Sequence, residues 1–115
     1  MNAALPYDYA HIETLVSGFV PQWRALGYGA VVAIARGGLF PGLIASTELS
    51  LPLHALAYAR TTRNVSWYTV DQPSPASKIL LIEDIAGRGT TLVDCLDFLH
   101  TQGHQVDVFA LAYDA

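Results

Sequence analysis

The chain has little cysteine and no long apolar run. A single cysteine, Cys95, occurs among 115 residues, so no disulfide can form within the chain. It falls in a helical pattern, which favours a small buried apolar residue over a nucleophile. No apolar run approaches the ~20 residues that a membrane span requires, and no basic region followed by an apolar core opens the sequence. We therefore expect no signal peptide, no membrane partner and a cytoplasmic location.

Charge is also scarce, and basic charge most of all. Charged residues make up 14% of the chain, six of them Lys or Arg, and the formal net charge is −4. Sequence-independent binding of nucleic acid needs a basic face, so this composition argues against a nucleic-acid partner. The 52% of apolar residues suffices for the core of one domain over 1–115. It also predicts exposed apolar surface that a homodimer or larger homo-oligomer would cover.

The spacing of apolar residues predicts helices and strands in alternation. Asp8 is expected to cap a helix that Pro21 kinks or shortens and that Gly27 ends. Further along the chain the patterns predict a strand over 30–35, a helix over 39–49, strands over 53–59 and 79–83, a helix over about 90–102 and a strand over 106–113. Runs without a polar residue are typical of strands covered on both faces.

The segment 60–77 does not fit this alternation. It is polar, contains two prolines, and predicts a long loop with a short strand at 66–70. Trp67 and Tyr68 in it could stack on a ligand, or pack within the protein. The remaining alternation predicts a single-domain α/β fold with a Rossmann-like parallel sheet and helices on both faces.

Two of the predicted strands end in glycine loops. Arg36-Gly37-Gly38 follows the strand 30–35, and Gly87-Arg88-Gly89 follows the strand 79–83 after the acid pair Glu83-Asp84. Ligands of open parallel sheets bind beyond the carboxyl ends of the strands, where the strand order reverses. If these two strands are neighbours there, both loops open onto one site.

The second loop has the composition of a phosphate site. Glycines 87 and 89 let backbone N–H groups converge, Thr90 and Thr91 add hydroxyls, and the following helix adds the positive end of its dipole. Glu83 and Asp84 suit the hydroxyls of a sugar, or a magnesium ion already held by phosphate oxygens. The alternative is a solvated strand-to-helix turn with two acids beside it.

The basic residues gather near the same edge of the predicted sheet. Four of the six cations fall there: Arg36, Arg60, Arg63 and Arg88. A ligand with several negative charges explains this concentration in an acidic protein. The alternative is that these arginines only avoid the helices and strands.

Both loops lie in segments that resemble a known family. The segment "ILLIEDIAGRGTTL" resembles the phosphoribosyl-pyrophosphate (PRPP) motif of the type I phosphoribosyltransferases, and "VVAIARGGLFPGLIAS" resembles their pyrophosphate loop. The bacterial xanthine–guanine phosphoribosyltransferases are the most similar group. The two motifs span much of residues 30–99.

The resemblance implies a role for each residue of the two loops. Glu83 and Asp84 would be the catalytic pair, binding the ribose hydroxyls directly or through Mg²⁺, the expected cofactor. Arg36 and Gly37 would hold pyrophosphate, next to a cis peptide between Ala35 and Arg36. A flexible lid over 60–77 would close on PRPP, with Arg60 and Arg63 as candidate contacts. The 5′-phosphate would lie against Ala86, Gly87, Arg88, Gly89, Thr90 and Thr91.

The implied activity is transfer of the 5-phosphoribosyl group from PRPP to a purine-like base, with release of pyrophosphate, in nucleotide salvage. The partners would be PRPP or a nucleoside monophosphate and an unknown acceptor base. Three features depart from the family: Gly87 in place of a frequent acid, Arg88 in place of a usual threonine, and an end at Ala115 where base-specific members continue into a hood. Two alternatives stay open. One is an inactive regulatory module that binds PRPP or a nucleotide. The other is a piece of a longer enzyme, or a chain whose partner completes the acceptor pocket.

Overall fold

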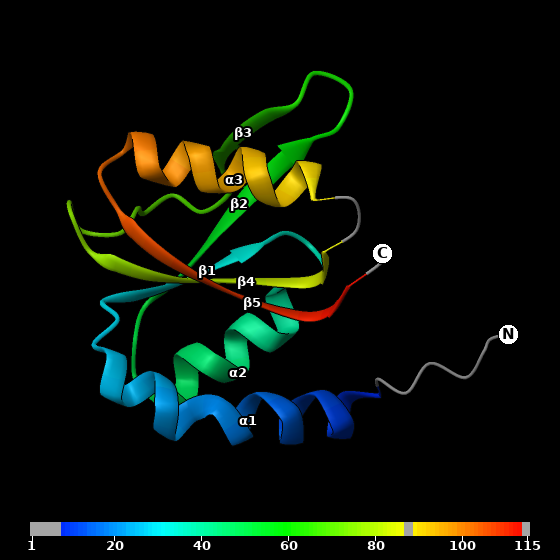
Figure 1. Ribbon diagram of the computed structural model, residues 1–115, viewed down its shortest axis with the longest axis vertical. Coiled ribbons are helices and arrows are strands. Elements are labelled where there is room, and N and C mark those ends of the chain that lie inside the picture. Colours follow the sequence, from blue (N-terminus) through cyan, green and yellow to red (C-terminus); the bar gives the residue numbers. More distant parts are fainter. Residues whose placement is uncertain (1–7, 87–88, 114–115) are drawn as a thin grey trace, which may run out of the picture.

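The helices and strands alternate along the chain, with one additional short strand. The computed structural model describes residues 8–86 and 89–113 (Figure 1). In chain order the elements are α1 (Tyr9–Leu26), β1 (Ala30–Ile34), α2 (Leu39–Leu49), β2 (Leu53–Ala59), β3 (Asn64–Trp67), β4 (Lys78–Ala86), α3 (Thr90–Thr101) and β5 (Gln105–Tyr113). No helix within this described part is long and apolar enough to cross a bilayer.

The strands form one sheet of mostly parallel strands in the order β3-β2-β1-β4-β5. The central strand β1 pairs in parallel with both β2 and β4, and β4 pairs in parallel with β5. The chain leaves β1 through α2 toward β2, and leaves β4 through α3 toward β5, in opposite directions. Because such crossovers are right-handed, the two helices cover opposite faces, with α1 beside α2 (Figure 1). The strand order therefore reverses between β1 and β4.

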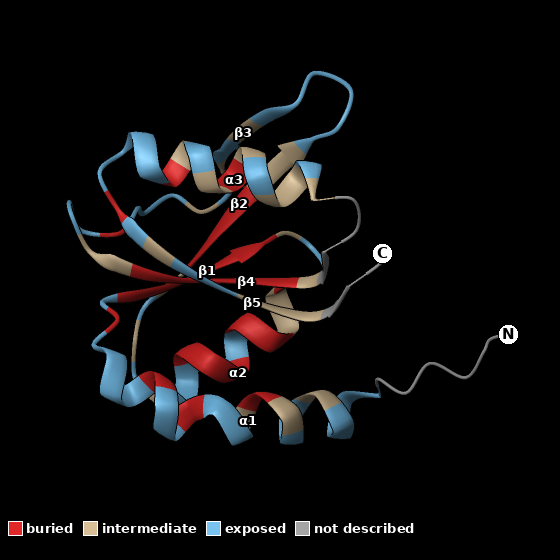
Figure 2. Ribbon diagram, viewed as in Figure 1, coloured by how far each residue is buried: buried red, intermediate tan, exposed pale blue. Residues whose placement is uncertain are grey.

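The core lies in two layers on either side of β1 and β4. Side chains alternate along these strands, so Val31 and Leu80 pack toward α1 and α2, whereas Val32 and Leu81 pack toward α3. All five residues of β1 are buried (Figure 2), which confirms the prediction of a strand covered on both faces. Cys95 is buried in the α3 layer, and burial raises the pKa of its thiol to about 12. It is therefore a packing residue, as expected.

The first helix begins and ends where the sequence predicts. The side chain of Asp8 accepts a hydrogen bond of 2.8 Å from the backbone N–H of His11. Gly27, at the other end, adopts a left-handed conformation with φ 74°. Pro21 does not end the helix, which continues through it to Leu26.

The segment 60–77 is more regular than predicted. A strand is present, but it is Asn64–Trp67 and not 66–70, and it pairs antiparallel with β2 from Ala59↔Asn64 to Leu56↔Trp67. The Trp67 ring packs edge-on against Phe98 of α3, with ring centroids 5.8 Å apart. Trp67 thus packs within the protein instead of facing a ligand.

Candidate functional site

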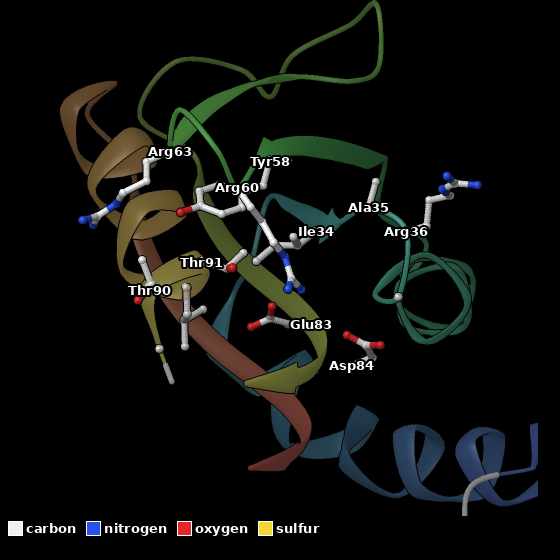
Figure 3. Close-up of a pocket in the computed structure, with 13 residues that line it drawn as sticks. Ile34, Ala35, Arg36, Tyr58, Arg60, Arg63, Glu83, Asp84, Thr90 and Thr91 are labelled. Atoms are coloured by element: carbon white, nitrogen blue, oxygen red, sulfur yellow. The ribbon is translucent and has the colours of Figure 1, made fainter. Parts of the chain in front are cut away.

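A cavity of about 680 Å³ lies beyond the carboxyl ends of β1, β2 and β4 (Figure 3). Both glycine loops reach it, because β1 and β4 are neighbours at the point where the strand order reverses. Four segments of the chain provide its lining: Ile34, Ala35, Arg36 and Gly37; Tyr58, Arg60 and Arg63; Glu83 and Asp84; and Gly89, Thr90, Thr91 and Leu92.

Most of the residues predicted for the site are in this lining. Of the others, Ala86 ends β4, and Gly87 and Arg88 lie outside the described residues. Sequence reasoning did not assign Tyr58 or Leu92 to the site. The sequence indicated these two residues only by their positions, Tyr58 near the carboxyl end of a predicted strand and Leu92 in the first turn of a predicted helix.

The two acids at the end of β4 have different surroundings. Consecutive strand residues point to opposite faces, so Glu83 lies on the α3 side and Asp84 on the α2 side. Glu83 is 7% exposed, and its Oε2 atom has no hydrogen-bond partner among the described residues. Burial, followed by the charge of Asp84, raises the pKa of Glu83 from 4.5 to about 7, and the charge of Arg60 opposes this shift. A hydroxyl group or a cation supplied by a ligand would complete this buried carboxyl.

The first glycine loop lies directly against the end of β4. A Cβ atom on Gly37 would lie 2.1 Å from Cγ of Asp84, and one on Gly38 would lie 2.4 Å from the carbonyl oxygen of Ile82. Both distances are far below van der Waals contact. The backbone beside Gly38 cannot move aside, so the approach requires glycine there, whereas a side chain at Gly37 would displace the carboxylate of Asp84. The peptide bond between Ala35 and Arg36 is cis, as the resemblance implies.

The second loop leads into the exposed amino end of α3. Gly89 precedes the helix with φ 85°, and its position provides no side-chain cap for the first turn. The first N–H groups of a helix and its dipole favour an anion. Thr90 and Thr91 of this first turn line the cavity, on the side of Glu83 that faces α3 (Figure 3). This end of the cavity therefore suits a phosphate group.

The arginines near the cavity are not equivalent. The side chain of Arg60 forms no hydrogen bond with another described residue, and its charge acts on Glu83. Arg63 instead donates two hydrogen bonds to Asp94 of α3, of 2.9 and 2.7 Å. Arg36 is exposed and points away from the two acids (Figure 3). The predicted flexible lid stays a prediction. Within 60–77, only Arg60 and Arg63 line the cavity.

The acids could hold a metal ion only together with a ligand. Within residues 8–86 and 89–113, no three His, Cys, Asp or Glu side chains are grouped in a way that could bind a metal. Glu83 and Asp84 supply carboxylate oxygens, which are donors that Mg²⁺ prefers, and Mg²⁺ commonly takes its other ligands from phosphate groups and water. The residues therefore fit an ion that arrives with a phosphorylated ligand.

The sequence matches no protein-family model and no curated protein. Solved structures do resemble it. A purine phosphoribosyltransferase from Pyrococcus horikoshii has a TM-score of 0.76 at 14% identity, over 93% of this chain and 83% of that chain. A xanthine-guanine-hypoxanthine phosphoribosyltransferase from Helicobacter pylori has a TM-score of 0.74 at 18% identity, over 95% and 84%. A hypothetical protein from Neisseria gonorrhoeae with bound ppGpp has a TM-score of 0.74 at 20% identity, over 93% and 69%.

These similarities establish the fold. The chain has the core of the type I phosphoribosyltransferases, which confirms the predicted fold class. The archaeal purine enzyme and the Helicobacter pylori enzyme match it almost equally, so the fold does not single out the xanthine–guanine group. At these identities the likeness concerns the fold and not the substrate.

The contact between the first glycine loop and β4 can be tested through stability. Gly38→Ala places a Cβ against the backbone at Ile82 and Ile34, so we expect the free energy of unfolding to fall by about 1–3 kcal/mol. Gly18→Ala is the control, because a Cβ on that α1 residue meets nothing within 4 Å. It should leave the stability unchanged or raise it by up to ~1 kcal/mol. Equal stabilities of the two variants in urea unfolding would contradict the close approach.

The buried carboxyl of Glu83 predicts a pH-dependent stability. Because the pKa of Glu83 is raised in the folded protein, its contribution is most favourable below pH 4.5 and is lost as the pH rises toward 7. Glu83→Gln cannot ionise, so the variant does not undergo this loss of stability as the pH rises. The stability of the variant relative to the wild type should therefore increase between pH 4.5 and 7. Urea unfolding at pH 5 and pH 8 measures the difference, with Glu13→Gln on the exposed side of α1 as the control for a lost charge. A difference that does not change with pH would contradict the prediction.

Proposed function

We propose that the protein is a phosphoribosyltransferase that transfers the 5-phosphoribosyl group of PRPP to a purine-like nitrogenous base and releases pyrophosphate. The observation that carries this proposal is the order of groups along one cavity. The amino end of α3, the acid pair Glu83-Asp84 and the loop Arg36-Gly37 line it together. PRPP presents a phosphate, a ribose and a pyrophosphate in the same order. The similarity in fold to purine phosphoribosyltransferases supports this reading.

Each part of the cavity takes one part of the ligand in this proposal. The 5′-phosphate binds at the amino end of α3, against Gly89, Thr90 and Thr91 and the residues 86–88 before them. The ribose hydroxyls bind Glu83 and Asp84, where a hydroxyl provides the missing partner of the buried Oε2 atom. The pyrophosphate lies against Arg36 and Gly37, and Arg60 is the further cation of the cavity.

The chemistry follows from this placement. The bond from C1′ of the ribose to pyrophosphate breaks, and its electron pair leaves with pyrophosphate. A base nitrogen forms the new bond to C1′ and releases its proton to water. Positive charge develops on the ribose during this exchange. Glu83 and Asp84 stabilise it when ionised. The guanidinium of Arg60 stabilises the departing pyrophosphate, joined by that of Arg36 once its exposed side chain turns toward the cavity. Holding the base and C1′ in line lowers the entropic part of the barrier.

The proposed cofactor is Mg²⁺. Asp84 and Glu83 would hold it together with oxygens of PRPP, because the two carboxylates alone do not make a full site. When bound, Mg²⁺ neutralises charge on the pyrophosphate group. A homodimer or larger homo-oligomer stays part of the proposal because of the high apolar content of the chain, 52%. The cytoplasmic location stays a prediction from the sequence.

The binding step can be tested with PRPP and Mg²⁺ in a calorimetric titration. The wild type should bind, and Asp84→Asn should weaken binding by about 10- to 100-fold, as expected for the loss of a charged hydrogen-bond partner. Asp97→Asn is the matched control, because Asp97 is an exposed acid on α3 that does not line the cavity. Unchanged affinity in Asp84→Asn would contradict the assignment of the site.

The transfer step needs a second assay, release of pyrophosphate with a panel of purine and pyrimidine bases. We expect turnover with at least one purine. PRPP binding without release for any base would contradict the transferase proposal and would favour the regulatory alternative. The ppGpp bound to the Neisseria gonorrhoeae protein motivates this comparison, so ppGpp is titrated alongside PRPP.

A further inference from the structure

Asp94 of α3 connects three elements beside the cavity. It lies one turn after Thr90, in the helix whose amino end lines the cavity. Its carboxylate accepts hydrogen bonds from Nε and Nη2 of Arg63, at 2.9 and 2.7 Å, and from the hydroxyl of Tyr58 at 2.5 Å. Two parallel bonds from one guanidinium to one carboxylate give the geometry in which arginine binds most specifically.

The acceptor of these bonds is well covered. The Asp94 side chain is 14% exposed, whereas the Arg63 side chain is 60% exposed. The bonds from Arg63 and then from Tyr58 lower the pKa of Asp94 to about 2, so the carboxylate is ionised at neutral pH. Exposed ion pairs contribute little when they are isolated, but a bidentate pair with a third donor is the case in which they hold a fixed geometry.

The backbone at Arg63 provides a second, independent observation. Arg63 lies in the short turn between β2 and β3 and has φ 58°. This left-handed conformation is uncommon for a residue other than glycine. Such a conformation persists where surrounding contacts over-determine it. Here the contacts are the two hydrogen bonds to Asp94.

The same turn carries Arg60. It begins after Ala59 and ends before Asn64, so Arg60 and Arg63 are its first and last residues. In Figure 3, Arg63 points toward α3, whereas Arg60 points toward the space above Glu83. Trp67 attaches the far end of β3 to α3 through Phe98. The position of Arg60 therefore depends on how the near end is attached.

We propose that Asp94 is a positioning residue, which anchors the β2–β3 turn to α3 through Arg63 and Tyr58 and thereby holds Arg60 at the cavity. Arg63 is part of this anchor and not a contact for the ligand. The choice of PRPP as the ligand that tests the position of Arg60 rests on the proposed function. The anchoring itself does not.

The anchor is tested first without a ligand, by backbone hydrogen exchange. Asp94→Asn and Arg63→Gln should raise exchange of the amides in 57–67 by about tenfold, because the turn loses its charged bonds. Tyr58→Phe keeps the ring and removes only one hydrogen-bond donor, so it should give a smaller increase in amide exchange. This mild variant keeps the test valid if the other two variants fold poorly. Asp97→Asn, the same change on the exposed side of α3, should have no effect. Unchanged exchange in Asp94→Asn and Arg63→Gln would overturn the anchor.

The effect on the site is tested by titration with PRPP and Mg²⁺. Asp94→Asn and Arg63→Gln should each weaken binding by about tenfold, and the double variant by no more than either single one, because both break the same unit. Arg60→Gln should weaken binding similarly and should make a further Asp94→Asn change ineffective. If Arg63→Gln weakens PRPP binding by the same factor in the wild type and in the Asp94→Asn variant, Arg63 is a ligand contact and the proposal is wrong. Raised exchange with unchanged affinity would overturn the positioning role.

A wild-type protein that does not bind PRPP would contradict the proposed function alone. Inorganic pyrophosphate then replaces PRPP as the probe, because it needs only the cations at the cavity. Its affinity should fall in Arg60→Gln and Asp94→Asn but not in Asp97→Asn. If pyrophosphate binds the wild type and Asp94→Asn equally, the positioning role is overturned in this case too.

Discussion

The site depends on one close contact, between the β1–α2 loop and the end of β4. Gly37 and Gly38 have no side chains, so the loop lies directly against Asp84 and the backbone at Ile82. This contact is possible because β1 and β4 are neighbours in the sheet and the chain leaves them in opposite directions. It places Arg36 and Gly37 in the same cavity as the two acids and the amino end of α3. A larger side chain at Gly38 would push the loop away from the end of β4, and one at Gly37 would displace the carboxylate of Asp84.

The electrostatics of the cavity favour binding at some expense of stability. Glu83 is buried with an unpartnered oxygen in the described structure, which is unfavourable for the unliganded protein and is relieved by a donor from a ligand. Unsatisfied groups of this kind are typical of functional sites, where surrounding structure keeps them in place. On the other wall the ion pair of Asp94 and Arg63 is satisfied within the protein. Glu83 is therefore left to interact with a ligand, whereas the pair of Asp94 and Arg63 maintains the shape of the cavity.

The sequence predicted the parts of the fold that local patterns determine. The run without polar residues predicted β1 because a central parallel strand is buried on both faces, and Asp8 predicted the start of α1 because its side chain caps the helix. The sequence predicted a short strand in this segment but not its bounds, since an edge strand shows only weak alternation and the contact of Trp67 with Phe98 of α3 cannot be read from the sequence. The sequence did not predict the pairing of Arg63 with Asp94, because the two residues are 31 positions apart in the chain. Two arginines in one polar segment look alike in the sequence, and only tertiary contacts distinguish them.

In the proposed function one ligand, PRPP, spans the cavity from the amino end of α3 to the loop Arg36-Gly37. A crystal structure of the protein with PRPP and Mg²⁺ tests it most directly. The 5′-phosphate should lie at Gly89–Thr91, the ribose hydroxyls within hydrogen-bond distance of Glu83 and Asp84, and the pyrophosphate at Arg36 and Gly37. Pyrophosphate at the amino end of α3, or PRPP bound outside this cavity, would contradict it.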